Sequence, residues 1–229
     1  MQKNILVIGG NSLIGQEVIK LSNSKGDNVI ATSRSTIDLP LENFILLDPN
    51  EDLSSLDALP DSIDALLYCP GSISLKSIQR MDISDIRKDF RINVEGAFNI
   101  IKKVLPNLKK DEGASVVFIS SVAAKSGMTF HSSIAASKAA LEGFARSLAS
   151  ELAPRVAVNC IAPSLTNTPM AEHLLNNEKK LQSSEERHPL NTIGDPAKVA
   201  KVIYNLFSAK EDWITGQTIS IDGGLSSLR

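Results

Sequence analysis

A glycine-rich turn near the start of the chain has the residue types that bind a diphosphate. An apolar strand, residues 4–8, runs directly into Gly9-Gly10-Asn11-Ser12-Leu13-Ile14-Gly15, and a helical pattern follows. Glycine lets the backbone approach a pyrophosphate, and the first turn of a helix has unpaired N–H groups that attract an anion. The segment predicts a dinucleotide-binding loop, with an ordinary strand-to-helix turn as the alternative.

The second predicted strand ends in a pair of residues that suits a phosphorylated ribose. Ser33 and Arg34 stand where NAD-binding folds carry an acidic residue for the ribose 2′-hydroxyl. A guanidinium stays charged and pairs with phosphate through two parallel hydrogen bonds. We therefore expect NADP(H) rather than NAD(H), with a solvated surface arginine as the alternative. Asp48, after the third strand, can accept a hydrogen bond from adenine or begin a turn with Pro49.

Six further motifs follow in order along the chain. They are Tyr68-Cys69-Pro70-Gly71, Asn93-Val94-Glu95-Gly96, Ser120-Ser121, Ala136-Ser137-Lys138-Ala139-Ala140-Leu141-Glu142-Gly143-Phe144, Asn159-Cys160-Ile161-Ala162-Pro163-Ser164-Leu165-Thr166-Asn167-Thr168, and Trp213-Ile214-Thr215-Gly216-Gln217 with Asp222-Gly223-Gly224. With the glycine loop, they resemble the classical short-chain dehydrogenase/reductase family, and within it the 3-oxoacyl-carrier-protein reductases. The resemblance spans residues 3–224. The loop departs from the family pattern at Ile8 and Leu13, which replace its threonine and middle glycine.

The resemblance implies an oxidoreductase that transfers hydride between NADP(H) and a small carbonyl or alcohol. By this resemblance, Asn93, Ser121 and Lys138 are the catalytic asparagine, serine and lysine. The implied cofactor-binding residues are Gly9, Asn11, Ser12, Leu13, Ile14, Gly15, Ser33, Arg34, Asp48, Pro49, Cys69, Pro70, Gly71, Lys138, Pro163, Leu165 and Thr168. The resemblance also implies a homo-oligomer, a tetramer or dimer built through the segments near 82–109 and 133–152.

Ile134 is the main departure from the family pattern. The family's catalytic tyrosine lies four residues before the lysine, and this chain has Ile134 there. A phenol, whose free pKa is about 10, exchanges a proton with a carbonyl or alcohol, whereas isoleucine has no proton to exchange. Three interpretations are open. Another group donates the proton, the substrate is a C=C or C=N bond with different proton handling, or the protein binds NADP(H) without turnover as a sensor or scaffold.

His131 is the main candidate for a replacement proton donor. It lies three residues before Ile134 and seven before Lys138, which places the three on one helix face if the helix begins that early. Imidazole, with an unperturbed pKa of about 6.5, is a suitable acid. The alternative is that His131 is a loop or capping residue. Ser132 or Ser133 acting with a water is a weaker candidate.

The hydrophobic pattern predicts the scaffold that must bring these residues together. Candidate strands cover residues 4–8, 28–32, 43–47, 63–68, 114–120, 155–160 and 217–221, and candidate helices cover residues 13–24, 51–58, 82–109, 133–152 and 195–208. This alternation predicts an α/β fold of the Rossmann type, a doubly wound parallel sheet of about seven strands in the order 3-2-1-4-5-6-7 with helices on both faces. Ligands of such sheets bind beyond the carboxyl ends of the strands.

Residues 164–193 form a polar stretch without a strong strand pattern. We expect a mobile excursion that covers the substrate rather than a domain boundary, so residues 1–229 are predicted to form one NAD(P)-binding domain. Four apolar residues of the excursion favour an uncharged or aliphatic substrate, or else pack helices together. They are Leu165, Met170, Leu174 and Leu175.

Composition argues against several other classes of protein. Lys and Arg number 24 and Asp and Glu number 26, so the basic surplus of a nucleic-acid-binding protein is missing. No apolar run approaches the ~20 residues of a membrane span, and the first residues lack a secretion signal. Cys69 and Cys160 have no metal or redox spacing, so we expect buried thiols, no metal site and a cytoplasmic protein. Cys69 as a reactive thiol is the less favoured reading.

Overall fold

The computed structural model describes residues 2–36, 41–109 and 113–228. Within these residues, seven parallel strands form a sheet in the order β3-β2-β1-β4-β5-β6-β7. The strands are β1 (Asn4–Ile8), β2 (Asn28–Ser33), β3 (Asn43–Leu46), β4 (Ala65–Tyr68), β5 (Ala114–Ile119), β6 (Val156–Pro163) and β7 (Thr218–Ile221). The predicted fold class and strand order are confirmed.

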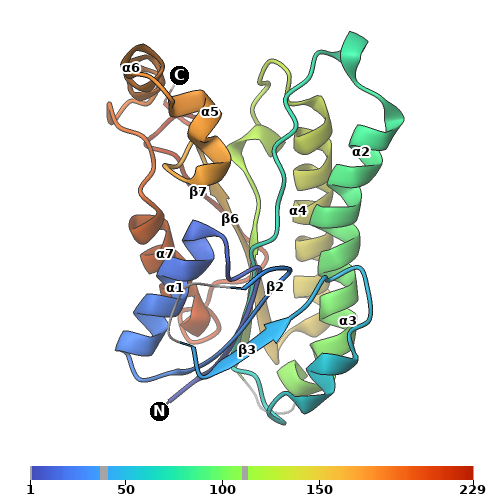
Figure 1. The fold of residues 1–229 in the computed structure, drawn as a ribbon. Coiled ribbons are helices and arrows are strands. Elements are labelled where there is room, and N and C mark those ends of the chain that lie inside the picture. Colours follow the sequence, from blue (N-terminus) through green and yellow to red (C-terminus); the bar gives the residue numbers. More distant parts are fainter. Residues whose placement is uncertain (1, 37–40, 110–112, 229) are drawn as a thin grey trace.

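Helices cover both faces of this sheet, as its sequence requires. Successive residues of β1 point to opposite faces: Ile5 and Val7 belong to one buried cluster, and Leu6 and Ile8 belong to the other. The first cluster is covered by α1 (Leu13–Ser24) and α7 (Pro196–Asn205), and the second by α3 (Gly96–Lys109) and α4 (Ser132–Leu152). Figure 1 shows these two pairs on either side of the strands. Strands buried on both faces are near-continuous apolar runs for this reason.

The register of the strands aligns their carboxyl ends. Ile8 at the end of β1 pairs with Thr32 on one side and with Tyr68 on the other, and Tyr68 pairs in turn with Phe118. The turns that follow β1, β2, β4 and β5 therefore lie side by side at one edge of the sheet.

The predicted helix 82–109 is confirmed as one unbroken helical stretch, but it contains an irregular turn that the sequence did not predict. It consists of α2 (Ile83–Phe90), a π-helical turn (Arg91–Glu95) and α3. The side-chain amide of Asn93 donates to the carbonyl oxygen of Asp89 at 2.8 Å, which is the acceptor that the backbone amide of Asn93 would use in a regular α-helix. Single π-turns inside helices are frequent at functional sites.

Other element boundaries differ more modestly from the prediction. The predicted helix 51–58 is only a 3₁₀ turn (Ser54–Ala58). The predicted helix 195–208 consists of α7 followed by a 3₁₀ turn (Leu206–Ser208). The predicted strand 63–68 is shortened to β4, whereas the predicted strand 155–160 continues to Pro163 in β6.

The excursion after β6 contains short helices that the sequence did not predict. A 3₁₀ turn (Pro169–Ala171) leads into α5 (Glu172–Leu175) and α6 (Glu178–Glu186). A β-bridge between Thr166 and Gly194 closes the base of the excursion. Figure 1 shows α5 and α6 at one end of the molecule, on the side to which β6 leads.

Candidate active site

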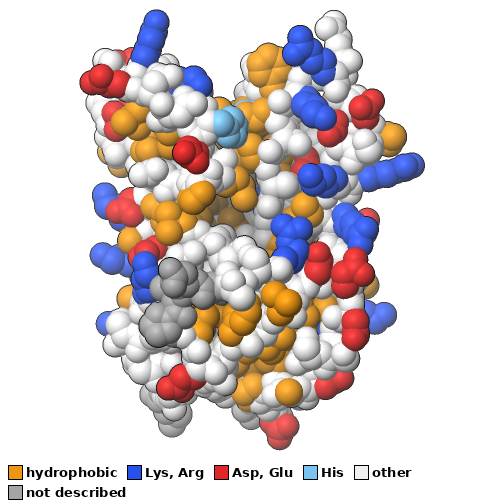
Figure 2. Space-filling model, in the orientation of Figure 1, with side chains coloured by type: hydrophobic (Ala, Val, Ile, Leu, Met, Phe, Trp, Pro, Cys, Tyr) orange, Lys and Arg blue, Asp and Glu red, His pale blue; other side chains and the backbone are white. Residues whose placement is uncertain are grey.

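A cleft of about 690 Å³ opens at the carboxyl edge of the sheet. The turns after β1, β2, β4, β5 and β6 all contribute to its lining. Figure 2 shows the surface hollowed between the α5–α6 end and the α2 end of the molecule. All of the predicted cofactor-binding residues except Gly15 line this cleft, as do Ser121, His131, Ile134 and Lys138.

The glycine loop is built around two positions that exclude a side chain. Gly9 has φ +78° and its amide donates to the carbonyl oxygen of Thr32 at 2.9 Å. A Cβ on Gly9 would lie 2.9 Å from Pro70, and one on Gly15 would lie 2.9 Å from the carbonyl oxygen of Gly9. Ser12 caps α1 by accepting from the amide of Gly15 at 3.1 Å. The turn is therefore held close to the helix N-terminus that faces the cleft, where an anion is favoured.

The ends of β2 and β3 form the wall expected to hold the adenosine. Ser33 is buried, while the next residue, Arg34, is exposed and lines the cleft. Asp48 lines the same wall, and its Oδ1 accepts from the amide of Asn50 at 2.9 Å. This aspartate therefore stabilises a turn, and its second carboxylate oxygen can accept a further hydrogen bond.

Cys69 has the surroundings of a structural thiol. It is buried and unpaired by any disulfide, and its Sγ lies 2.9 Å from Oγ of Ser12. Burial raises the pKa of the Cys69 thiol, against smaller opposing effects of Ser12 and Lys138. A protonated thiol is a poor nucleophile, so the residue packs the β4 turn against the glycine loop.

Lys138 is a buried cation in the lining of the cleft. It lies on α4, is 5% exposed, and its Nζ donates to the carbonyl oxygen of Ile119 at 2.6 Å. Burial lowers the pKa of Lys138 to about 8. A Cβ on Gly71 would lie 3.6 Å from this nitrogen, so the β4 turn passes directly beside it.

Asn93 presents an unsatisfied acceptor next to this lysine. Its Nδ2 donates to Asp89 and to Oγ of Ser137, at 2.8 and 3.2 Å. Its Oδ1 is buried and has no hydrogen-bond partner in the described part of the chain. A Cβ on Gly71 would lie 3.8 Å from this oxygen. A buried acceptor of this kind is costly unless a donor such as a water occupies the adjacent space.

The candidate acid–base residues share the cleft but differ in burial. Ser121 is half-buried at the end of β5, and Ile134 is 3% exposed on the first turn of α4. His131 is half-buried at the N-cap of α4, and its Nδ1 lies 2.7 Å from the carbonyl oxygen of Thr129. Because α4 begins at Ser132, His131 occupies the N-cap position, which is the capping alternative that the sequence left open. It also lines the cleft.

Tyr68 also lines the cleft, but its hydroxyl is already hydrogen-bonded to the backbone. The hydroxyl donates to the carbonyl oxygen of Ile92 at 2.6 Å, and the side chain is 1% exposed. Burial raises the pKa of Tyr68 far above its usual value. The proton of this tyrosine therefore stays on the phenol, and Tyr68 does not replace the missing tyrosine at position 134.

The excursion forms one wall of the cleft. Leu165 and Thr168, predicted to bind the cofactor, line the cleft here together with Met170 and Leu174, next to Pro163 at the end of β6. Leu175 does not line the cleft. Three of the four apolar residues singled out from the sequence thus face the cleft.

Several polar residues of the site were not identified from the sequence. Ser72 lines the cleft directly after Gly71, and Asp89 is buried just behind it, with Ser72 donating to its Oδ1. The sequence had a signal for Asp89 alone, because it lies four residues before Asn93 on the same face of the predicted helix. Lys88 and Arg187 add positive charge to the rim.

The residues that the structure describes contain neither a metal-binding cluster nor a membrane-spanning helix. Their His, Cys, Asp and Glu side chains form no group of three or more that could hold a metal ion. None of their helices has the length and apolar character needed to cross a membrane.

Comparison with known proteins gives consistent matches. A family model described as enoyl-(acyl carrier protein) reductase matches residues 54–226. The 3-oxoacyl-[acyl-carrier-protein] reductase FabG of Buchnera aphidicola subsp. Baizongia pistaciae is 30% identical over 240 residues, 98% of this chain and 97% of that protein. Ligand-free Thermoplasma acidophilum aldohexose dehydrogenase has a TM-score of 0.92 at 27% identity, covering 100% of this chain and 95% of its own. The Pseudomonas aeruginosa RhlG/NADP active-site complex has a TM-score of 0.89 at 26% identity, covering 98% and 96%.

Proposed function

Because this chain belongs to the short-chain dehydrogenase/reductase family and is an NAD(P)-dependent oxidoreductase, we propose that it uses NADP(H) to transfer hydride to or from a small carbonyl or alcohol substrate. A C=C or C=N substrate is included in this proposal, because position 134 lacks the phenol that serves carbonyl chemistry. The observation that carries the proposal is that the glycine loop and a buried lysine line the same cleft.

The residues of the cleft fit a nicotinamide dinucleotide. The turn at Gly9 and Gly15 has no room for a Cβ, which keeps backbone amides accessible to a pyrophosphate. Arg34 at the end of β2 is exposed toward the cleft and would pair with a 2′-phosphate. The NADP-bound state of RhlG, a structural neighbour of this chain, supports the choice of NADP(H).

Different residues of the cleft would have different roles in the reaction. The bound cofactor supplies or accepts the hydride. Lys138 would donate to the ribose next to the nicotinamide, and its positive charge would favour proton release nearby. Ser121 would orient the substrate oxygen, and Asn93 would hold a water through its unsatisfied Oδ1. His131, on the rim, is the sequence-derived candidate for the proton donor.

The substrate would be small and largely apolar. Leu165, Met170 and Leu174 face the cleft from the excursion, and burying such side chains against an aliphatic group is favourable. We propose that residues 1–229 act as one domain in which residues 164–193 cover the substrate and exclude water.

Cofactor choice is tested by thermal unfolding of the purified protein with NADP or with NAD. A ligand that binds only the native state raises stability by about 2.7 kcal/mol at 100 times its Kd. We expect NADP to raise the Tm more than NAD at equal concentration. Equal or greater stabilisation by NAD would remove the argument from Arg34. No stabilisation by either dinucleotide would overturn the proposal itself.

A silent NADP(H)-binding sensor or scaffold is the second candidate, and Ile134 is the observation that favours it. The side chain lines the cleft without a polar atom. Turnover is tested by following NADPH absorbance with carbonyl, imine and enone substrates. Reduction of at least one class by the parent protein supports an enzyme. Carbonyl reduction that appears only in Ile134→Tyr would support the silent binder.

A further inference from the structure

A buried carboxylate lies directly behind one wall of the cleft. Asp89 of α2 is 1% exposed. Its Oδ1 accepts a hydrogen bond from Oγ of Ser72, and its Oδ2 accepts one from Oγ of Ser133 at 2.6 Å. Burying a carboxyl group is unfavourable unless it is paired or hydrogen-bonded, and these two hydroxyls provide a hydrogen bond to each of its oxygens. The carboxylate therefore has a built site, to which a loop and two helices contribute.

Ser72 connects this carboxylate to the reacting end of the cleft. It lines the cleft together with Ile134 and Lys138, and it directly follows Gly71, whose Cβ position would lie 3.6 Å from Nζ of Lys138. Ser133, on the far side of Asp89, immediately precedes Ile134 on α4. The carboxylate thus lies between the β4 turn and the helical turn that lacks the family phenol.

The direction of these hydrogen bonds determines what Ser72 can do. Its proton points to Asp89, so the lone pairs of its oxygen remain as acceptors for a donor in the cleft. A hydroxyl that donates to a carboxylate becomes a stronger acceptor, because consecutive hydrogen bonds polarise one another. An alcohol in the cleft is such a donor.

The geometry points to Ser72 and Asp89, rather than His131, as the route for the substrate proton in place of the missing phenol, an inference that rests on the proposed function. In alcohol oxidation, the carbinol carbon gives up its hydrogen as hydride, with two electrons, to the cofactor. The O–H bond breaks, its proton passes to Oγ of Ser72, and the proton of Ser72 passes to Oδ1 of Asp89. A C=O bond forms, and Asp89 becomes a carboxylic acid. After the carbonyl product leaves, the proton returns through Ser72 to water in the cleft, and carbonyl reduction reverses each step.

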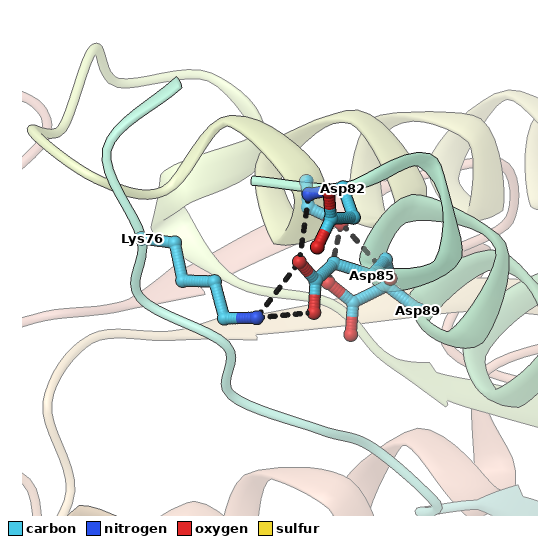
Figure 3. A network of polar contacts seen from close by, with 5 residues as sticks. Lys76, Asp82, Asp85 and Asp89 are labelled. Atoms are coloured by element: carbon cyan, nitrogen blue, oxygen red, sulfur yellow. Dashed lines mark hydrogen bonds and ion pairs between the residues drawn. The ribbon is translucent and has the colours of Figure 1, made fainter. Parts of the chain in front are cut away.

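The charged groups around Asp89 come from three elements. Asp85 lies one turn earlier on α2 and is held by Lys76 of the preceding loop at 2.7 and 2.8 Å. Figure 3 shows Lys76 reaching Asp85 while Asp89 lies on the same side of the helix. Lys138 approaches from α4; burial lowers its pKa, and Asp89 is among the groups that oppose this shift. Asp85 is therefore a matched control: its carboxylate lies one turn away and pairs with Lys76, while its link to Ser133 is through the backbone carbonyl oxygen at 3.5 Å, which a side-chain substitution leaves in place.

Three variants alter the proposed route: Ser72→Ala, Asp89→Asn and the double variant that combines these two substitutions. Asp85→Asn and His131→Ala are measured for comparison. Oxidation would be measured with NADP and the alcohol form of the best carbonyl substrate found in the absorbance screen. Acid–base groups contribute roughly 100-fold or more, so we expect kcat to fall about 100-fold in S72A and in D89N. The double variant should lose no more than either single one, because the two residues act as a unit. The acid limb of the pH profile should disappear in D89N, while D85N stays within about twofold of the parent.

A second measurement does not depend on turnover. With NADPH and the alcohol both bound, no hydride can be transferred, so the carboxyl ¹³C resonances of labelled aspartate report contacts alone. We expect the Asp89 resonance, assigned from D89N, to move when the alcohol is added and the Asp85 resonance to stay. Loss of the shift in S72A would support the route through Ser72.

The outcomes separate this inference from the proposed function. If the parent turns over substrate and S72A and D89N match it, the inference is wrong and the proposed function stands. Loss of the acid limb in H131A but not in D89N would also overturn it. If D89N does not fold, S72A and its ¹³C shift decide. If the parent binds NADP(H) but reduces no substrate, both fail together.

Discussion

The ammonium group of Lys138 is almost excluded from water, and this burial changes its pKa. The ammonium group is 5% exposed and donates to the carbonyl oxygen of Ile119. Burial lowers its pKa from 10.5 to about 8, with Cys69, Cys160 and Asp89 opposing the shift. The lysine can thus lose or gain a proton near neutral pH at modest cost, which suits a site that handles protons.

The lowered pKa of Lys138 predicts how stability depends on pH. The folded pKa of about 8 lies below the unfolded value of 10.5, so between these values the unfolded chain binds more protons and stability rises with pH, by up to about 1.4 kcal/mol per pH unit. Lys138→Met removes this contribution. We therefore expect the parent to gain free energy of unfolding relative to K138M between pH 8 and 10, measured by urea denaturation. A constant difference across this range would contradict the assignment.

The proposed preference for NADPH over NADH can be tested at a single residue, Arg34. Charge-assisted hydrogen bonds contribute about 1.5–3 kcal/mol, so Arg34→Ala should weaken NADPH binding roughly 10- to 100-fold. NADH lacks the 2′-phosphate, and its affinity should stay within a factor of about three. Isothermal titration calorimetry measures both. Arg80→Ala, an exposed arginine outside the cleft lining, is the control, and an equal loss for both dinucleotides in R34A would refute the phosphate contact.

The turn between β1 and α1 allows steric crowding to be separated from backbone strain. Gly9 and Gly26 have nearly the same φ, +78° and +80°, but a Cβ on Gly9 meets Pro70 at 2.9 Å and one on Gly26 meets nothing within 4 Å. Gly26→Ala should cost about 1 kcal/mol for the left-handed conformation alone. Gly9→Ala should cost at least about 1 kcal/mol more and should weaken NADPH binding. Equal losses in urea denaturation would mean that the loop relaxes around the added methyl group.

The same elements show what the sequence could and could not predict. The strands were predictable because a parallel strand covered on both faces must be a run of apolar residues, as in β5. Motif spacing placed Lys138 and Ser121 in one cleft. The cluster around Asp89 could not be predicted, because it joins a loop and two helices whose relative rotation depends on packing. The π-turn that directs Asn93 toward Lys138 adds one residue to a helical turn, and apolar periodicity has no signal for that.

Taken as a whole, the molecule separates its stabilising parts from its chemical parts. Two apolar clusters bury both faces of the sheet, while polar side chains gather at the carboxyl edge, where the strands end and backbone groups are free to meet a ligand. Residues such as Lys138, Asp89 and Asn93 are unfavourable in a folded core. Their burial at this edge is tolerated because the two clusters provide the stability.

The outer surface of α3 and α4 predicts self-association. Phe98 of α3 is 50% exposed, and its ring lies 6.2 Å from the ring of Phe144 of α4. Phe144 is half-buried, so the exposed face of Phe98 extends an aromatic contact between two helices to the surface. Surface aromatic residues of this kind are enriched at the centre of interfaces. We expect a dimer or tetramer by light scattering, and Phe98→Asp should shift it to a smaller species at micromolar concentration. Leu46→Asp, at an exposed site on the edge strand β3, is the control. If F98D leaves the mass unchanged, this helix pair is not the interface, and a monomeric parent would remove the expectation of an oligomer.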